Sequence, residues 1–191
     1  MAVDPFLKKK WERVFYTFFD TNKNKVIDWN DFELLFEEIK QLRGEDSTEF
    51  KIASDAMGSV WKGLVMETKH LDFMDPIPDD TEITLEEWDA VWSKFNPRKL
   101  PVWQWEYLKY MFFLIDTSGD KKIDKKEYTD VMKIYKLSEA DAAKAFEKFA
   151  VNPADKKKLD SIDYGQFVAL WNEYFTGKNK DAPGSFLFGP W

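Results

Sequence analysis

Oxygen-bearing groups recur at alternate positions in the segment 116–127. They fall at the first, third, fifth, ninth and twelfth places, with a backbone carbonyl at the seventh: Asp116, Ser118, Asp120, Lys122, Asp124 and Glu127. Hard divalent cations take such oxygens, and twelve-residue loops that end in a two-oxygen Glu hold Ca²⁺ in this way. A solvated acidic turn would not place five matches in register. The segment therefore predicts a calcium site.

A second segment, 20–31, repeats the pattern with one change at its end. Its expected ligands are Asp20, Asn22, Asn24, Val26 through its carbonyl, Asp28 and Asp31. Asp31 is one methylene shorter than Glu, so it supplies a single oxygen or draws the following helix inward. Six oxygens in a smaller cage suit Mg²⁺ better than seven suit Ca²⁺. This segment predicts a second metal site at which Mg²⁺ competes.

The sixth position departs from the pattern in both segments. The chain turns there with a positive φ, for which Gly is the usual residue, but the sequence has Lys25 and Lys121. A side chain in that conformation costs roughly 1 kcal/mol, which weakens binding without abolishing it. The segment 116–127 has acids at its first, fifth and twelfth places, whereas 20–31 has them at its first and twelfth. The greater ligand charge makes 116–127 the tighter predicted calcium site.

Two further segments keep the spacing but have lost ligands. The segment 76–87 has Pro76 and Pro78 at its first and third places, and prolines have no side-chain oxygen. It is predicted to be metal-free, with an irregular site left open by the neighbouring acids Asp75, Asp79 and Asp80.

The segment 155–166 has lost more. Lys157, Leu159 and Gln166 stand at its third, fifth and twelfth places, so we expect it to bind nothing. The role left to both degenerate segments is structural, namely to pair with a metal-binding one.

An isoleucine at the eighth place is common to all four segments, followed by an acid or amide and an aromatic residue: Ile27/Asp31/Phe32, Ile83/Glu87/Trp88, Ile123/Glu127/Tyr128 and Ile162/Gln166/Phe167. A repeat of this kind indicates one supersecondary unit used four times. In EF-hand loops this apolar position forms a short strand with a partner loop. The sequence therefore predicts EF-hand repeats in two pairs.

Helices must flank these loops. The apolar residues Trp11, Val14, Phe15, Phe18 and Phe19 follow a helical period, and similar patterns recur through Ile39, Phe149 and Phe175. Ser138 is typical of a helix N-cap. The prediction is an all-α chain with an N-terminal pair at 1–95, a linker at 96–101, a C-terminal pair at 102–176 and an apolar tail at 177–191.

Four large apolar side chains gather in that tail: Phe186, Leu187, Phe188 and Trp191. Leaving them in water would expose a patch that invites association. We expect the tail to pack between the two halves, on the surface that a calcium sensor would offer to a target. The alternative is a hook that binds a partner.

Composition excludes several classes of function. The net charge of −7 argues against nucleic-acid binding, which needs a basic patch, and the absence of cysteine rules out thiol chemistry. No signal peptide or apolar run long enough for a membrane span is apparent, so we expect a cytoplasmic monomer. The single His70 has no evident catalytic partner, and Gly58–Gly63 lacks the Lys-Ser/Thr of a phosphate loop, so no enzyme is predicted.

The chain resembles the invertebrate sarcoplasmic calcium-binding proteins along nearly its whole length. The resemblance is carried by Asp116–Asp120 with Ile123–Lys125, by Val26–Ile27 with Trp29 and Asp31–Leu34, and by Leu187–Gly189. It implies a cytosolic fold of four EF-hands in which one or two loops have lost their ligands, and calcium buffering in muscle or neurons. The two lysines at the sixth position and the two prolines of 76–87 depart from the family pattern.

Two other functions stay open. A calcium sensor would regulate a protein target through a Met-rich groove, but the six methionines here are scattered. A carrier of an apolar ligand, such as a luciferin, would resemble photoproteins, which have several inward histidines where this chain has one. Buffering is therefore the favoured prediction.

Overall fold

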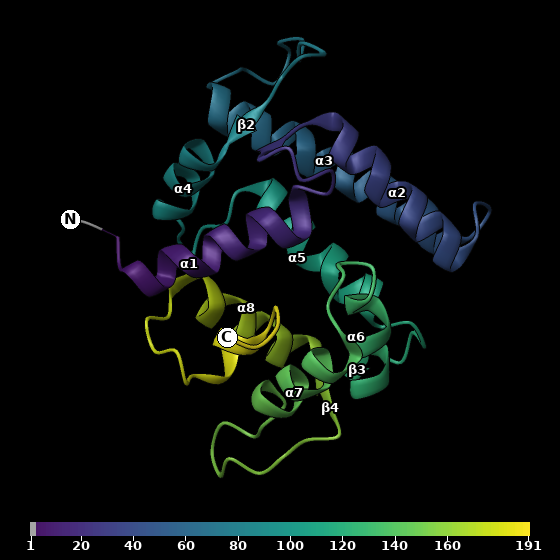
Figure 1. Cartoon of the computed structure of the whole chain (residues 1–191), viewed down its shortest axis with the longest axis vertical. Helices are drawn as coiled ribbons and strands as arrows, with labels where there is room; N and C mark the ends of the chain where they lie inside the picture. The colour runs from purple at the N-terminus through teal and green to yellow at the C-terminus, as the bar shows by residue number, and fades with distance from the viewer. Residues whose placement is uncertain (1–2) are drawn as a thin grey trace. The chain divides into compact units, whose positions relative to one another are not determined.

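The computed structural model describes residues 3–191, which fold into helices joined by short strand ladders (Figure 1). The α-helices span Pro5–Val14 (α1), Trp29–Arg43 (α2), Thr48–Lys69 (α3), Leu85–Ser93 (α4), Val102–Ile115 (α5), Lys125–Met132 (α6), Glu139–Phe149 (α7) and Tyr164–Thr176 (α8). A π-helix covers Phe15–Phe19 (η1) and a 3₁₀-helix covers Pro183–Phe186 (η2). The predicted all-α class is confirmed.

Two antiparallel ladders pair the loops as predicted. The strands are Val26–Ile27 (β1) with Ile83–Thr84 (β2), and Lys122–Asp124 (β3) with Ser161–Asp163 (β4). Ile27 lies opposite Ile83, and Ile123 lies opposite Ile162. All four side chains are buried. Apolar side chains at the ladder thus tie each ligand-rich loop to a degenerate one, and the four repeats form two pairs.

The described chain divides into two compact units. One is Trp11–Tyr110, and the other joins the segment that ends at Lys10 to Met111–Trp191. The division falls inside α1 and α5. The boundaries predicted from sequence, at residues 95 and 102, differ from these and stay a prediction.

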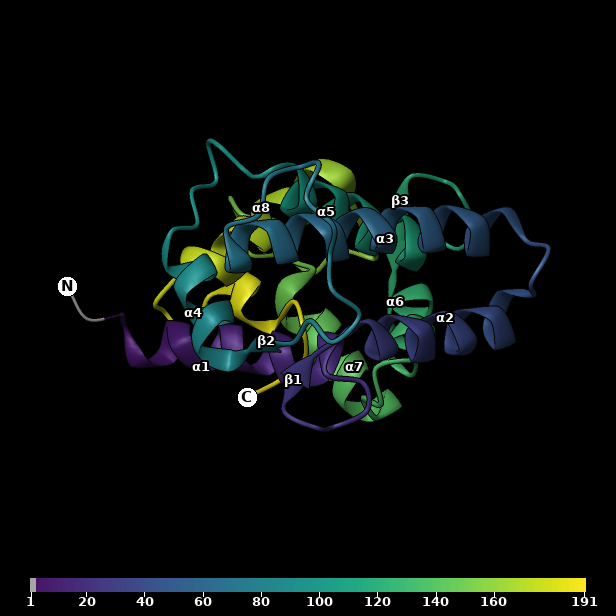
Figure 2. The same ribbon diagram turned by 90° about the horizontal axis from the view of Figure 1, so that it is seen from above.

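An aromatic cluster forms much of the core of the unit Trp11–Tyr110. Trp88 is fully buried, and its ring centroid lies 5.9 Å from that of Phe15 and 4.8 Å from that of Phe19. Its indole N–H donates to the carbonyl of Trp11 at 3.0 Å, which satisfies the polar atom of a buried Trp. In the same unit α2 and α3 run side by side (Figure 2).

The last turn before the first loop is wider than an α-helix. η1 begins directly after α1, and the N–H of Asp20 donates to the carbonyl of Phe15, five residues back, at 2.8 Å. The predicted apolar face continues through this turn, since Phe15, Phe18 and Phe19 are buried. Single π turns of this kind occur often at functional sites. Here the turn delivers Asp20 to the start of the loop.

Gly63 lies where α5 comes close to α3. A Cβ at this position would stand 2.4 Å from the Cβ of Trp103, so only glycine permits the approach. The Trp103 indole N–H also donates to Glu67 of α3 at 2.6 Å. Gly58 and Gly63 are both inside α3, which agrees with the rejection of a phosphate loop.

In the second unit, Lys10 joins α1 to the end of α8. Its side chain is buried, and its ammonium donates to the carbonyls of Gly177 at 2.6 Å and Glu173 at 3.3 Å. In return the Tyr174 hydroxyl donates to the carbonyl of Lys10 at 2.9 Å. A cation near the end of a helix satisfies carbonyls that have no partner within the helix.

The tail contributes buried side chains to this same unit. Leu187 and Phe188 are 1% exposed, and η2 packs against α7 and α8. The predicted place of the tail between the two halves stays a prediction.

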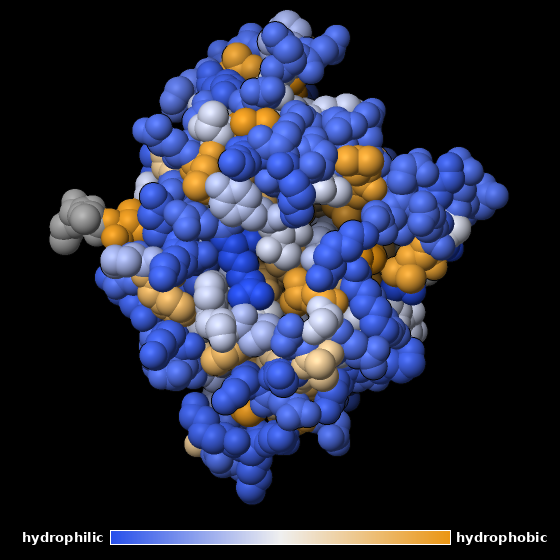
Figure 3. Space-filling view, in the orientation of Figure 1, coloured by the Kyte–Doolittle hydropathy of each residue, from blue (hydrophilic) through white to orange (hydrophobic). Residues whose placement is uncertain are grey.

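Hydrophilic residues cover most of the face drawn in Figure 3, with apolar residues in separate small patches. Among the described helices, none combines the length and the apolar character needed to cross a membrane.

Candidate metal centres

The first loop is closed by a capping box at the start of α2. Asp28 accepts the N–H of Asp31 at 3.2 Å, and Asp31 accepts the N–H of Asp28 at 2.9 Å. The other oxygen of Asp31 accepts the N–H of Asn22 at 2.9 Å. The twelfth position is thus brought against the third and the ninth.

The remaining predicted residues of this loop bond along it. The side-chain oxygens of Asn22 and Asn24 accept the N–H groups of Asn24 and Val26, at 2.9 and 3.0 Å. The Asn24 amide donates to Asp28 at 3.0 Å. These bonds fix the turn and hold its oxygens on one short stretch of chain.

Asp20 supplies the test of whether a cation fits here. Its side chain is 1% exposed, and Oδ2 accepts the N–H of Lys25 at 3.3 Å, while Oδ1 is buried without a hydrogen-bond partner. A buried carboxylate oxygen with no partner is unfavourable. The donor set of carboxylates, amides and a carbonyl is that of a hard divalent cation, so the residues present fit a metal.

The electrostatics of the first loop point the same way. Burial raises the pKa of the Asp31 carboxyl, and the charges of Asp28 and Asp20 raise it further, against the hydrogen bonds from the N–H groups of Asn22 and Asp28. Negative charge is therefore concentrated at this end of the loop. A cation held there would offset the free-energy cost of placing these negative charges close together in a partly buried site.

The third loop has the same closure at the start of α6. Glu127 accepts the N–H of Ser118 at 2.8 Å through Oε1 and that of Asp124 at 3.0 Å through Oε2. Burial tends to raise the pKa of Glu127, but the hydrogen bonds from Asp124, Ser118 and Thr117 outweigh it, so the pKa lies below its ordinary value. The carboxylate form is thus favoured in this loop.

Asp116 and Asp120 face the backbone of their own loop. Asp116 accepts the N–H groups of Gly119 and Lys121, at 2.9 and 3.0 Å, and Asp120 accepts that of Lys122 at 2.8 Å. In the part of the chain that the structure describes, no three acidic or histidine side chains converge tightly enough to enclose an ion. The two complete ligand sets therefore remain predictions.

The backbone at the sixth position has the conformation expected from sequence. Lys25 has φ 74° and Lys121 has φ 67°, both in the left-handed region that favours glycine. The fourth position is left-handed as well, with Lys23 at φ 65° in the first loop and Gly119 at φ 73° in the third. The sequence reasoning missed this second turn, although Gly119 is a signal for it.

The fourth loop begins earlier than predicted. The N–H groups of Ala150 and Val151 donate to the carbonyls of Phe146 and Phe149, at 2.8 Å each. The third loop starts with the same two bonds: Asp116 donates to Phe112 at 2.9 Å, and Thr117 donates to Ile115 at 2.8 Å. Ala150 therefore takes the place of Asp116, five residues before the predicted start at Asp155. The frame 155–166 is wrong at its beginning because extra residues follow α7, and the first position has no oxygen ligand.

A lysine from the preceding helix pairs with the last residue of the second loop. Lys69, the last residue of α3, places its ammonium 2.6 Å from Oε1 of Glu87, which stands at the twelfth position. Oε2 of Glu87 accepts the N–H of Thr84 at 2.9 Å. The ion pair was not anticipated, since 18 residues separate its members. His70 follows as an exposed left-handed cap of α3.

Four helix–loop–helix repeats in two ladder-linked pairs, with the ligand-bearing loops first and third, define an EF-hand protein of the calcium-binding class. No family model matches the chain. Calexcitin-1 of Caenorhabditis elegans is 35% identical over 196 residues, which cover 98% of this chain and 88% of the relative. The chain belongs to the calexcitin and sarcoplasmic calcium-binding protein family.

The chain is also similar to a second group of curated relatives and to solved structures that share its fold. Sarcoplasmic calcium-binding proteins I, III and IV of Branchiostoma lanceolatum are 26% identical, with 98% of each chain covered. The solved structure of a sarcoplasmic calcium-binding protein from amphioxus has a TM-score of 0.74 at 23% identity, over 98% of both chains. The photoprotein clytin shares the fold at a TM-score of 0.67 and 16% identity, over 96% of this chain and 93% of clytin.

Proposed function

We propose that this protein binds calcium at two sites, 20–31 and 116–127, and buffers it in the cytoplasm of muscle or nerve cells. The observation that carries the proposal is the buried Oδ1 of Asp20, which has no hydrogen-bond partner at the first position of an oxygen-lined loop. The membership in a calcium-binding family supports it. In this proposal the protein acts as a monomer and catalyses no reaction.

The ligands we assign to the first site are the side chains of Asp20, Asn22, Asn24, Asp28 and Asp31 with the carbonyl of Val26. Those of the third loop are the side chains of Asp116, Ser118, Asp120, Asp124 and Glu127 with the carbonyl of Lys122. The shorter Asp31 makes the first site the one at which Mg²⁺ competes. The third loop is the tighter calcium site.

Calorimetric titration with Ca²⁺, with and without Mg²⁺, tests the number and the order of the sites. We expect two ions per chain, and we expect Mg²⁺ to weaken the lower-affinity step. Glu127→Gln should remove the tighter step and Asp31→Asn the weaker one. Gln166→Glu, at the same position of the fourth loop, is the matched control and should add no site. A third ion, or loss of the tighter step in Asp31→Asn, would contradict the assignment.

A further inference from the structure

The C-terminal tail fills an apolar groove on its own unit. Phe188 is buried, and its ring centroid lies 4.8 Å from that of Tyr174 and 5.6 Å from that of Trp171. The N–H of Gly184 donates to Oε2 of Glu173 at 2.6 Å. The tail is therefore a seated segment, held by a few apolar side chains and a few backbone hydrogen bonds.

A further hydrogen bond connects the tail to the residue that follows the third loop. The buried hydroxyl of Tyr128 donates to the carbonyl of Leu187 at 2.8 Å, and the Tyr128 ring packs against those of Phe146 and Phe149. Tyr128 follows Glu127, the twelfth residue of that loop. The residue proposed to close on the metal and the residue that holds the tail are thus consecutive in the first turn of α6.

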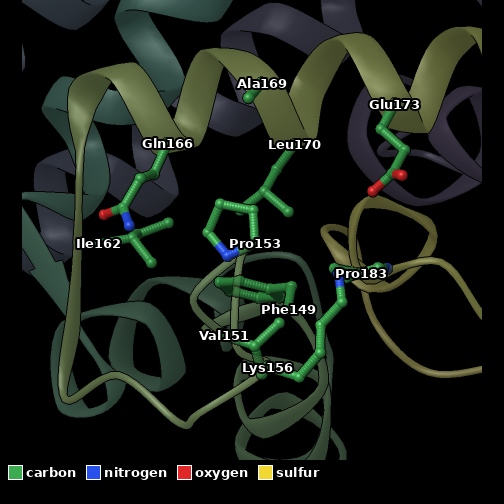
Figure 4. A pocket seen from close by; sticks show the side chains of 10 residues that line it. All are labelled: Phe149, Val151, Pro153, Lys156, Ile162, Gln166, Ala169, Leu170, Glu173 and Pro183. Carbon is green, nitrogen blue, oxygen red and sulfur yellow. The ribbon is translucent and has the colours of Figure 1, made fainter.

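The tail leaves part of the apolar surface beside it uncovered. A cavity of about 250 Å³ lies beside η2, lined mainly by apolar residues that include Phe149, Ile162 and Leu170, with Pro183 of the tail at its edge (Figure 4). Lys156 and Glu173 also line it, one charged side chain of each sign. A bound segment could therefore place an additional large apolar side chain here.

We propose that the groove under the tail is a binding surface for an apolar peptide segment, and that metal binding at 116–127 weakens the hold of the tail on it. The partner has a Leu-Phe pair like that of Leu187 and Phe188, with a further apolar residue for the cavity. This inference rests on the proposed calcium site at 116–127. The proposed coupling would let a calcium-buffering protein bind a peptide in a calcium-dependent way.

We infer the direction of the coupling from the hydrogen bonds of Glu127. The tail is seated while both oxygens of Glu127 accept backbone N–H groups, from Ser118 and Asp124. Bidentate ligation would turn both oxygens toward the metal, and we infer that this reorientation breaks these two bonds. A metal ion that favours a different arrangement of Glu127 also shifts the equilibrium of a segment coupled to Glu127, here the seated tail. The coupling free energy acts equally in both directions, so release of the tail also favours the metal-bound arrangement. Loosening the tail should therefore strengthen metal binding.

Thiol labelling can follow the tail directly, because the chain has no cysteine. Ser185, which belongs to the tail, is completely buried, and Ala145 is equally buried in α7. In the variant Ser185→Cys we expect Ca²⁺ to raise the labelling rate at least fivefold. In Ala145→Cys, the matched control for general opening of the unit, the rate should not change. Adding Glu127→Gln to Ser185→Cys should abolish the calcium effect.

A peptide with the sequence of residues 183–191 tests the binding surface. In the presence of Ca²⁺ it should raise the labelling rate of Ser185→Cys further, by competing with the tail for the groove, whereas a scrambled peptide should not. If the peptide and its scrambled form act alike, the groove is not a peptide site and the proposal fails.

Tyr128→Phe tests the coupling without a cysteine. Loss of the hydrogen bond to Leu187 should raise calcium affinity at the third loop about fivefold and leave the first site unchanged. If calorimetry shows Ca²⁺ bound at 116–127 while labelling of Ser185→Cys is unchanged or slower, the coupling is wrong and the proposed function stands. If calorimetry detects no binding at 116–127, the proposed function itself fails.

Discussion

The lysines at the sixth loop position hold a conformation that favours glycine, since Lys25 and Lys121 have φ of 74° and 67°. Lys121→Gly and Lys25→Gly should each relieve roughly 1 kcal/mol of backbone strain, which corresponds to about fivefold tighter calcium binding at the same loop. Glycine also gives the unfolded chain more freedom, which opposes the gain. The roughly fivefold increase in calcium affinity is therefore an upper bound. Calorimetric titration of each variant measures the change.

Lys122→Gly is the matched control, because the neighbouring seventh position lies in strand β3 and has no positive φ. We expect no gain in affinity from this variant. Equal or weaker calcium binding in both sixth-position variants would show that the lysines sit there without strain.

Lys10 gives the stability of the protein a distinctive pH dependence. Burial lowers its pKa to about 8, although the charges of Glu173 and Asp4 oppose the shift. Between pH 8 and the ordinary lysine value of 10.5, the unfolded chain keeps a proton that the folded chain has released. The free energy of unfolding should therefore rise with pH in this window, by at most about 1.4 kcal/mol per pH unit.

Denaturant titrations from pH 7 to 10.5 on the natural chain and on Lys10→Met measure this contribution. The difference in the free energy of unfolding between the two proteins should change steadily above pH 8, because the Met variant lacks the titrating group. Parallel pH profiles would show that Lys10 has an ordinary pKa in the folded chain.

At the scale of the helices, the approach of α5 to α3 depends on a missing side chain. Gly63→Ala would place a Cβ 2.4 Å from the Cβ of Trp103, so the helices must separate and the free energy of unfolding should fall by about 1–3 kcal/mol. Gly58→Ala is a matched control in the same helix, since a Cβ there meets no atom within 4 Å. It should stabilise the protein by roughly 0.5–1 kcal/mol.

Chemical denaturation of the two glycine variants, with Trp fluorescence as the signal, gives both values. Equal effects of the two substitutions would contradict the close packing of α3 on α5.

At the scale of the whole molecule, the tail should contribute to stability as part of the core. Phe188→Ala removes a ring that is 1% exposed and should lower the free energy of unfolding by about 3–5 kcal/mol. Phe73→Ala makes the same change at a ring that is 66% exposed, where the main loss is its contact with Lys62, worth about 0.5–1 kcal/mol.

Thermal unfolding and binding of a hydrophobic dye compare the two phenylalanine variants. A larger loss of stability and more dye binding are expected for Phe188→Ala. If Phe188→Ala melts at the temperature of the natural chain, the tail is free in solution and the partner-hook interpretation gains support.

The sequence by itself determined the class, the repeat and the ladder partners. The four isoleucines sit at a fixed distance from the start of the following helix, and that distance is set by local capping geometry. The ligand types follow from chemistry that is local to twelve residues, so the prediction that the first and third loops bind metal needed no tertiary information, and it stays a prediction. The positive φ at Lys25 and Lys121 was likewise predicted from position alone and is confirmed.

Only the tertiary structure decided the features that join distant parts of the chain. The start of the fourth loop at Ala150 depends on where α7 ends, which neither ligand spacing nor a count back from Gln166 reveals. Lys69 with Glu87, Lys10 with Gly177 and Tyr128 with Leu187 pair residues 18, 167 and 59 positions apart. Such contacts arise from packing, because only the fold brings polar groups from distant parts of the chain within reach of one another.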